Sequence, residues 1–160
     1  MLKYRKIKEK DNLVMAQIIR KNLEKYHLDI PGTAYFDPQL DALSTYYDEK
    51  LEKRCYFVVL NEKDEVVGGA GVAEFDGIDC CAELQKLYFD DSVKGKGYSK
   101  ELFMILEDWC KEAGYKSMYL ETHSSLAVAI HLYQKLDFRE IEKPKSVVHS
   151  TMDHFYLKKL

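Results

Sequence analysis

Two lysines and two glycines alternate in a short loop, Lys94-Gly95-Lys96-Gly97, and a helix-like pattern begins directly after them. Backbone amides converge where a loop enters a helix, and the helix dipole adds positive potential there, so such a junction can hold an anion. Glycine lets the backbone approach phosphate oxygens closely because it has no Cβ atom. The loop therefore predicts a site for a phosphorylated ligand, formed by Lys94, Gly95, Lys96, Gly97, Tyr98, Ser99 and Lys100.

The strand-like run before this loop ends in Leu87-Tyr88-Phe89. Strand end and loop together resemble the fingerprint of the GCN5-related N-acetyltransferase (GNAT) family, which is Gln/Arg-x-x-Gly-x-Gly/Ala after a strand ending in a triplet such as Leu-Tyr-Val. Lys94 stands where Gln or Arg is usual, and Ser99 where Gly or Ala is usual. The resemblance implies that the loop binds the pyrophosphate of coenzyme A. It also implies that the backbone of residues 87–89 pairs with pantetheine and that an amide there polarises the thioester oxygen.

The strand expected at residues 80–89 changes its apolar phase between Leu84 and Leu87. A β-bulge near Gln85-Lys86 restores a single apolar face, and it bends the strand and leaves backbone groups unpaired. An extended ligand with amide groups can pair with such an edge as an added strand would. The resemblance implies the same arrangement, with coenzyme A lying between two splayed parallel strands.

A second motif lies in the run Ala129–Phe138, A-I-H-L-Y-Q-K-L-D-F, which is similar to the family's A-x-x-L-Y-x-K-x-G-F signature. The resemblance implies that Tyr133 protonates the departing coenzyme A thiolate. A phenol with a pKa of about 10 suits that transfer. The alternative is a core tyrosine on the inner face of a helix. Asp137 replaces the usual helix-ending glycine, although Asp adopts the left-handed conformation less readily.

The start of the same helix also departs from the family. Leu126 stands where many members carry an asparagine that contacts the cofactor. The contact is therefore either absent here or made by Ser124 or Ser125, and we include Ser125 among the cofactor-binding candidates.

Two glutamates are candidates for the base that takes a proton from the attacking amine. Glu83 lies on the bulged strand, and some relatives use a glutamate on this strand directly or through water. Burial would raise the pKa of such a carboxyl group and suit it to this task. Glu121, at the end of the neighbouring strand, is the second candidate, and the alternative for each is a solvated or ion-paired carboxylate. His123 could assist.

The acceptor amine is expected to meet the N-terminal third of the chain, where aromatic and acidic residues are dense. Such residues suit a cationic amine, although packing of the domain is the alternative for most of the tyrosines. The residues are Tyr26, Tyr35, Phe36, Tyr46 and Tyr47, with Asp37, Asp41 and Asp48 beside them.

The elements that must position these residues alternate between helical and strand periodicity. Strands are expected at 2–7, 55–60, 66–75, 80–89, 117–121, 138–141 and 153–160. Helices are expected after an Asp11 cap, after Asp37-Pro38, at 97–113 and after a Ser124 or Ser125 cap. This order matches what the resemblance implies, an α/β fold with a mixed sheet of six or seven strands, about four helices and a splayed parallel pair.

Composition narrows the functional classes. The chain has 160 residues, 46% of them hydrophobic, which indicates one globular domain over residues 1–160. A net charge of −3 argues against a general nucleic-acid binder. No apolar run has the length of a membrane span, and the N-terminus lacks the apolar centre of a secretory signal. The four cysteines form no C-x-x-C pair and read as buried thiols, Cys55, Cys80, Cys81 and Cys110, which favours the cytoplasm.

The leading hypothesis is an acetyl-CoA-dependent N-acetyltransferase that acts on a small amine or a peptide amine, without nucleic acid, membrane or metal. A non-catalytic acyl-CoA sensor is the alternative, because the asparagine position is replaced. A phosphate-binding module unrelated to coenzyme A is disfavoured, because the loop lacks the G-x-x-x-x-G-K-[ST] spacing. The sequence does not identify the acceptor. It does not fix the oligomeric state either, and a homodimer is possible because family members often dimerise.

Overall fold

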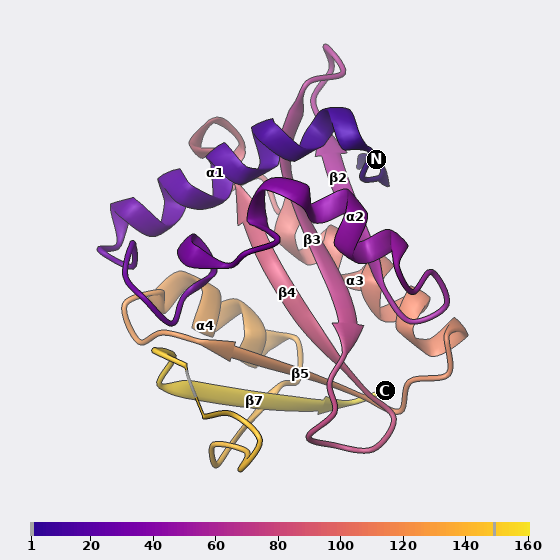
Figure 1. Ribbon diagram of the computed structural model, residues 1–160, viewed down its shortest axis with the longest axis vertical. Helices are drawn as coiled ribbons and strands as arrows, with labels where there is room; N and C mark the ends of the chain where they lie inside the picture. The colour runs from indigo at the N-terminus through magenta and orange to yellow at the C-terminus, as the bar shows by residue number, and fades with distance from the viewer. Residues whose placement is uncertain (1, 149) are drawn as a thin grey trace.

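A computed structural model of the protein describes residues 2–148 and 150–160. Its centre is a seven-stranded mixed sheet with the order β1-β2-β3-β4-β5-β7-β6 (Figure 1). All paired strands are antiparallel except β4 and β5, which are parallel. This confirms the predicted mixed sheet. The strands are β1 (Lys3–Lys6), β2 (Cys55–Leu60), β3 (Val66–Glu74), β4 (Cys81–Phe89), β5 (Ser117–Thr122), β6 (Arg139–Ile141) and β7 (His154–Lys159).

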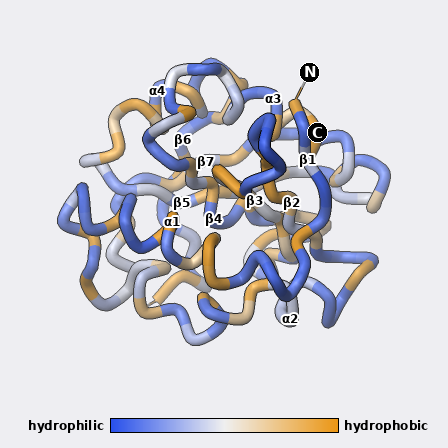
Figure 2. The backbone as a smooth tube through the Cα atoms, turned by 90° about the horizontal axis from the view of Figure 1, so that it is seen from above, coloured by the Kyte–Doolittle hydropathy of each residue, from blue (hydrophilic) through white to orange (hydrophobic). Residues whose placement is uncertain are grey.

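Helices cover both faces of the sheet, because α1 and α2 pack into one apolar core and α3 and α4 into another. Figure 2 shows α2 on the opposite side of the molecule from α3 and α4. Their bounds are α1 (Asn12–Lys25), α2 (Leu43–Asp48), α3 (Tyr98–Glu112) and α4 (Ala127–Lys135). In residues 2–148 and 150–160, none of the helices combines the length and apolar character that crossing a membrane requires. The predicted set of about four flanking helices is confirmed.

The two helical layers require strands that are apolar on both faces. In β2, Phe57 and Val59 belong to the core beneath α3 and α4, whereas Tyr56 and Val58 belong to the core beneath α1 and α2. Successive side chains of a strand point to opposite faces, so a continuous apolar run serves both cores. Burial on both sides holds the centre of the sheet in place, and with it the strand β4 that borders the site.

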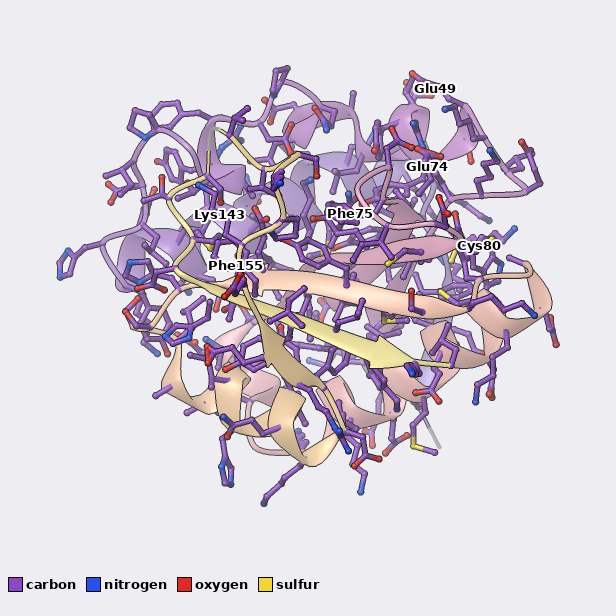
Figure 3. The ribbon with its side chains drawn as sticks, turned by 90° about the horizontal axis from the view of Figure 1, so that it is seen from below. Glu49, Glu74, Phe75, Cys80, Lys143 and Phe155 are labelled. Carbon is purple, nitrogen blue, oxygen red and sulfur yellow. The ribbon has the colours of Figure 1, made fainter. Side chains whose placement is uncertain are left out.

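A third apolar cluster lies where β3, β4, β5 and β7 meet the connection between β6 and β7. Tyr119 is fully buried there, and Phe75 stacks on it with ring centroids 4.0 Å apart. Figure 3 labels Phe75 and Phe155 of this cluster, together with Glu74 and Cys80 at the turn from β3 to β4. The β6–β7 connection is also tied to the loop after α1, because Thr151 Oγ1 donates a hydrogen bond of 2.6 Å to the Pro31 carbonyl.

The parallel strands β4 and β5 are paired only near their beginnings. Their register runs from Cys81 opposite Ser117 to Glu83 opposite Tyr119. Beyond Glu83, residues 84–89 have no partner on β5 in the part of the chain that the structure describes, and the two strands diverge in Figure 1. The predicted splay is confirmed.

A β-bulge accounts for the change of phase along β4. Gly71 lies opposite Gln85 and Gly69 opposite Tyr88, so Lys86 and Leu87 together face the single residue Ala70 of β3. Lys86 takes a positive φ of 52°. The extra residue returns Leu87 and Phe89 to the face that Leu84 occupies, which is the core beneath α3 and α4.

Asp11 is the N-cap residue of α1, as predicted, but its carboxylate makes no hydrogen bond to the helix amides; it accepts hydrogen bonds from the Arg5 guanidinium and from the Lys8 amide instead. The predicted serine cap of α4 is wrong. Neither serine caps α4, whose N-cap is Leu126. The Ser124 hydroxyl donates a hydrogen bond to the Asp153 carboxylate, and the Ser125 hydroxyl lies 2.8 Å from His123 Nδ1.

The expectation that all four cysteines are buried is wrong for Cys80, which is exposed. Cys80 follows the turn after β3 and adopts a positive φ of 51°. It therefore lies outside the pairing of β4 with β5, in which the neighbouring Cys81 is buried. The expected second helix also begins later than Asp37-Pro38. Single 3₁₀ turns at Ala34–Phe36 and Leu40–Ala42 precede α2.

Candidate functional site

A cavity of about 490 Å³ lies between the diverging ends of β4 and β5. Its walls come from the end of β4, the glycine loop with the start of α3, the end of β5, and α4, with α1 at one side. Most of the predicted cofactor-binding residues line it: Leu87, Tyr88, Phe89, Lys94, Gly95, Gly97, Tyr98, Ser99 and Lys100. The side chains of Lys96 and Ser125 do not line it, and their assignment stays a prediction.

The glycine loop has the geometry that an anion site needs. Gly95 and Gly97 adopt positive φ values of 81° and 80°, and a Cβ atom built at either would meet nothing within 4 Å. Gly97 is the N-cap of α3, and no side chain caps this helix start. The first amides of α3 therefore remain available to a ligand, and the loop is exposed to solvent.

Lys94 is held over this loop by two partners. Its Nζ atom lies 2.7 Å from Asn22 Oδ1 and 2.7 Å from Asp91 Oδ1. The same Asn22 donates through Nδ2 to the Phe89 carbonyl at 2.9 Å and to the Ile18 carbonyl at 2.8 Å. This one buried side chain thus connects α1 to the end of β4 and to the lysine of the loop.

Sequence reasoning missed Asn22. The available signal was a polar residue inside the apolar stripe of α1, directly before Leu23, since a buried amide needs hydrogen-bond partners. Its partners Phe89 and Lys94 lie about seventy residues further along the chain, and no local pattern names them.

The bulge in β4 is fixed by side chains from the other face of the sheet. The Tyr56 hydroxyl donates to the Lys86 carbonyl at 2.8 Å. Lys86 Nζ lies 2.8 Å from Asp37 Oδ2, and the lysine side chain is only 7% exposed. Lys86 lines the cavity and was also missed as a site residue, because its ion pair joins segments distant in sequence.

Tyr133 extends from α4 to the cavity wall. Tyr133 is only 7% exposed. Its hydroxyl forms no hydrogen bond among the described residues. Burial raises the pKa of Tyr133, and the neighbouring Tyr88 adds to this. The phenol is therefore protonated at neutral pH and free to donate its hydrogen.

Asp137 follows α4 with a positive φ of 69°. The Phe138 amide there donates to the Tyr133 carbonyl at 3.1 Å. This aspartate occupies the left-handed position at which the family usually has glycine.

Glu83 lies beside the cavity and does not line it. Burial raises the pKa of its carboxyl group to about 7, the nearby Glu121 and Asp37 charges act in the same direction, and a hydrogen bond from Gln85 opposes them. That bond runs from Gln85 Nε2 to Glu83 Oε1 at 2.8 Å, and Gln85 Oε1 in turn accepts from the Tyr47 hydroxyl at 2.7 Å. A carboxyl group with this pKa can exchange a proton near neutral pH.

Glu121 lines the cavity from the end of β5. Its Oε2 atom accepts a hydrogen bond of 2.9 Å from the Tyr119 hydroxyl, and its Oε1 atom accepts one of 2.8 Å from the Ser150 hydroxyl. Ser150 belongs to the β6–β7 connection, and sequence reasoning missed it.

The aromatic residues of the N-terminal third divide between two roles. Tyr26 lines the cavity. Tyr47 is buried in the core beneath α1 and α2, and the ring of Tyr46 packs against the Arg54 guanidinium at 4.0 Å. Packing, the alternative weighed for these residues, therefore applies to Tyr46 and Tyr47.

The chain is similar in sequence and in fold to known acetyltransferases. A family model for the acetyltransferase (GNAT) family matches residues 20–138. The uncharacterized N-acetyltransferase YjgM of Escherichia coli (strain K12) is 39% identical over 141 residues, which cover 86% of this chain and 82% of YjgM. A GNAT-family acetyltransferase from Staphylococcus aureus Mu50 superposes with a TM-score of 0.85 at 18% identity, over 99% of each chain. The PaiA N-acetyltransferase of Thermoplasma acidophilum, solved in complex with coenzyme A, superposes with a TM-score of 0.78 at 17% identity, over 100% of this chain and 99% of that one.

Proposed function

The chain belongs to the acetyltransferase (GNAT) family, and we propose that it transfers the acetyl group of acetyl-CoA to a primary amine of a small molecule or peptide, by direct attack in a ternary complex. The observation that carries the proposal is the cavity between the splayed strands, with an open glycine loop at one end and the Tyr133 hydroxyl on its wall. The PaiA relative, which shares this fold, was solved with coenzyme A bound.

The residues present fit coenzyme A. A loop with two glycines that lack a Cβ atom, followed by uncapped helix amides, suits the pyrophosphate, and Lys94 adds a cation there. The edge of β4 beyond Glu83, which has no strand partner on β5 among the described residues, offers backbone groups to the amides of pantetheine. The bound acetyl-CoA would supply a thioester-activated acetyl group next to residues 87–89.

Tyr133 is the proton donor in this proposal. Its hydroxyl lies on the cavity wall without a competing partner among the described residues, and its pKa is raised by burial, so the proton stays on the phenol until a stronger base forms nearby. A departing thiolate is such a base, and a positioned acid typically contributes about 100-fold to 10,000-fold in rate.

Glu83 is the base in this proposal, and it acts through water because its side chain does not line the cavity. A carboxyl group with a pKa of about 7 is half ionised near neutral pH and can accept the proton that an ammonium must lose. Much of the remaining rate would come from holding the two reactants together in the cavity.

One observation favours a non-catalytic acyl-CoA sensor as the second candidate. Leu126 lines the cavity where many family members have an asparagine, and Ser125, the substitute weighed for that contact, does not line it. A sensor would bind acetyl-CoA and release no thiol with any amine.

The test is Tyr133→Phe, with Tyr115→Phe as the matched control. The Tyr115 hydroxyl donates to the Lys53 carbonyl, away from the cavity. We expect Tyr133→Phe to lower the rate of thiol release with an accepted amine about 100-fold, and to leave the thermal stabilisation by acetyl-CoA unchanged. Equal rates for the two variants would overturn the role of Tyr133. Thermal stabilisation by acetyl-CoA without transfer to any primary amine would favour the sensor.

A further inference from the structure

The cavity reaches both faces of the sheet, because its lining includes residues of α1 as well as residues of α3 and α4. Along β5, Met118 and Leu120 point into the core beneath α3 and α4, whereas Tyr119 and Glu121 point to the opposite face. The glycine loop and Tyr133 belong to elements of the α3 and α4 side. If the donor occupies that side, the second reactant must approach from the other. We call this part of the wall the acceptor side; it consists of Tyr26, Lys86, Glu121, Leu126 and Met152.

Glu121 is the acidic side chain of the acceptor side. Among the described residues that line the cavity, it is the one carboxylate. The Tyr119 and Ser150 hydroxyls each donate one hydrogen bond to it and fix its orientation. A carboxylate can accept about four hydrogen bonds, so acceptor capacity remains for an ammonium group.

The cation of the acceptor side is already neutralised. Lys86 Nζ forms its ion pair with Asp37 in a largely buried position. The other lysines of the cavity wall, Lys94 and Lys100, belong to the glycine loop and the start of α3. Among the described residues that line the acceptor side, no unpaired cation remains, so a carboxylate on the acceptor would meet Glu121 without a charge to offset the repulsion.

The rest of the acceptor side is apolar. Tyr26 and Leu126 pack against the core beneath α1 and α2, and Met152 packs against the third cluster. Such a wall suits a hydrocarbon skeleton next to the amine.

Resting on the function proposed above, we propose that the acceptor is a primary amine on an apolar carbon skeleton with no carboxylate beside the amine, and that Glu121 binds its ammonium group. Alkylamines and arylalkylamines have this chemistry, and so does the side chain of a lysine within a peptide. Free α-amino acids lack it, because their carboxylate adjoins the amine.

Three acceptors with one skeleton test this proposal: phenethylamine, phenylalaninamide and phenylalanine. We expect phenethylamine and phenylalaninamide to be acetylated with kcat/KM values at least about 30-fold above that of phenylalanine. A fourth acceptor, Nα-acetyl-lysine amide, distinguishes a peptide source from a free amine. A higher kcat/KM for Nα-acetyl-lysine amide than for phenethylamine would indicate a peptide acceptor, and a lower one would indicate a small free amine. Either result supports the proposed class of acceptor.

Glu121→Gln, with Glu112→Gln at the exposed end of α3 as the matched control, tests the role of the residue. We expect Glu121→Gln to raise KM for phenethylamine about tenfold, to leave KM for acetyl-CoA unchanged, and to reduce the discrimination against phenylalanine. Calorimetric titration of phenethylamine into the protein–coenzyme A complex should show the same loss of affinity without any turnover.

Two results would overturn the inference and leave the proposed function standing. One is acetylation of phenylalanine as fast as, or faster than, phenethylamine. The other is unchanged KM and unchanged binding of phenethylamine in Glu121→Gln. If acetyl-CoA binds but no amine is acetylated, the proposed transfer fails, and calorimetric binding of phenethylamine still decides whether the acceptor side is assigned correctly.

Discussion

The two sides of the cavity are built in different ways. The phosphate-binding part of the donor side is one continuous segment, which consists of the end of β4, the glycine loop and the start of α3, and its loop offers backbone amides to the ligand. The acceptor side is assembled from side chains of α1, the bulge of β4, the end of β5, the start of α4 and the β6–β7 connection. Backbone geometry tolerates changes of side chain, whereas a wall of side chains changes with each substitution. We therefore expect donor binding to depend on conformation and acceptor choice to depend on individual residues.

Gly97→Val should produce the largest effect, because it adds a side chain at the helix start and strains the left-handed residue. Gly114→Val is the matched control: its φ is 93°, a Cβ there also meets nothing within 4 Å, and it lies beyond the other end of α3. Each change should cost about 1–2 kcal/mol of folding free energy or more. Only Gly97→Val should weaken coenzyme A binding, by about 100-fold, in a calorimetric titration. Similar affinities in the two variants would show that the loop does not hold the phosphates.

Glu83→Gln should lower acetyl transfer about 30-fold and remove the rise in rate between about pH 6 and about pH 8, because the amide cannot accept a proton. The folded protein keeps this proton up to a pH of about 7, whereas a carboxyl with the ordinary pKa of 4.5 loses it earlier. Between about pH 4.5 and about pH 7, unfolding therefore releases this proton, and the free energy of unfolding falls as the pH rises through that range.

The glutamine variant should lose this pH dependence of stability, and thermal unfolding at a series of pH values will measure it. A variant that keeps the wild-type pH–rate profile would exclude Glu83 as the base.

Asn22→Ala should weaken coenzyme A binding about tenfold, because it removes a partner of Lys94 and the donor to the Phe89 carbonyl. Asn12→Ala is a matched control in the same helix, since Asn12 is also buried and bonds Ser44 in both directions. Both variants should lose stability, but only Asn22→Ala should lose affinity. Equal affinity in the two variants would limit Asn22 to a structural role.

Ser150→Ala should have the smallest effect. It removes one of the two hydroxyl donors of Glu121, which is worth about 1 kcal/mol, so KM for an accepted amine should rise about fivefold or less while KM for acetyl-CoA stays constant. Ser146→Ala, in the same connection, is the control. A change in KM for acetyl-CoA in place of the amine would contradict the division into two sides.

The bulge and the glycine loop of the donor side could be predicted from the sequence because their determinants are local. The phase change from Leu84 to Leu87 specifies the bulge, and two glycines directly before a helix pattern specify the loop. Tyr26 and Glu121 of the acceptor side were also named from the sequence, but the contacts that position its side chains could not be predicted, because they join segments far apart, such as Ser150 to Glu121 and Lys86 to Asp37.

The side chains expected to cap two helices have other hydrogen-bond partners. The Arg5 guanidinium and the Lys8 amide donate to the Asp11 carboxylate, and the Ser124 hydroxyl donates to the Asp153 carboxylate. Local propensity predicts which side chain caps a helix. Competing hydrogen-bond partners elsewhere in the structure decide whether that side chain bonds the helix amides.

The bond from Thr151 to the Pro31 carbonyl spans most of the chain. During synthesis, everything that forms the phosphate loop and carries Tyr133 leaves the ribosome before Thr151 does. A nascent chain that ends before Ser150 thus contains the segments of the donor side while its acceptor side still lacks Ser150 and Met152. In the proposal above, the acceptor side is therefore completed only when the C-terminal segment has been made, with Ser150 and Met152 first and β7 after them.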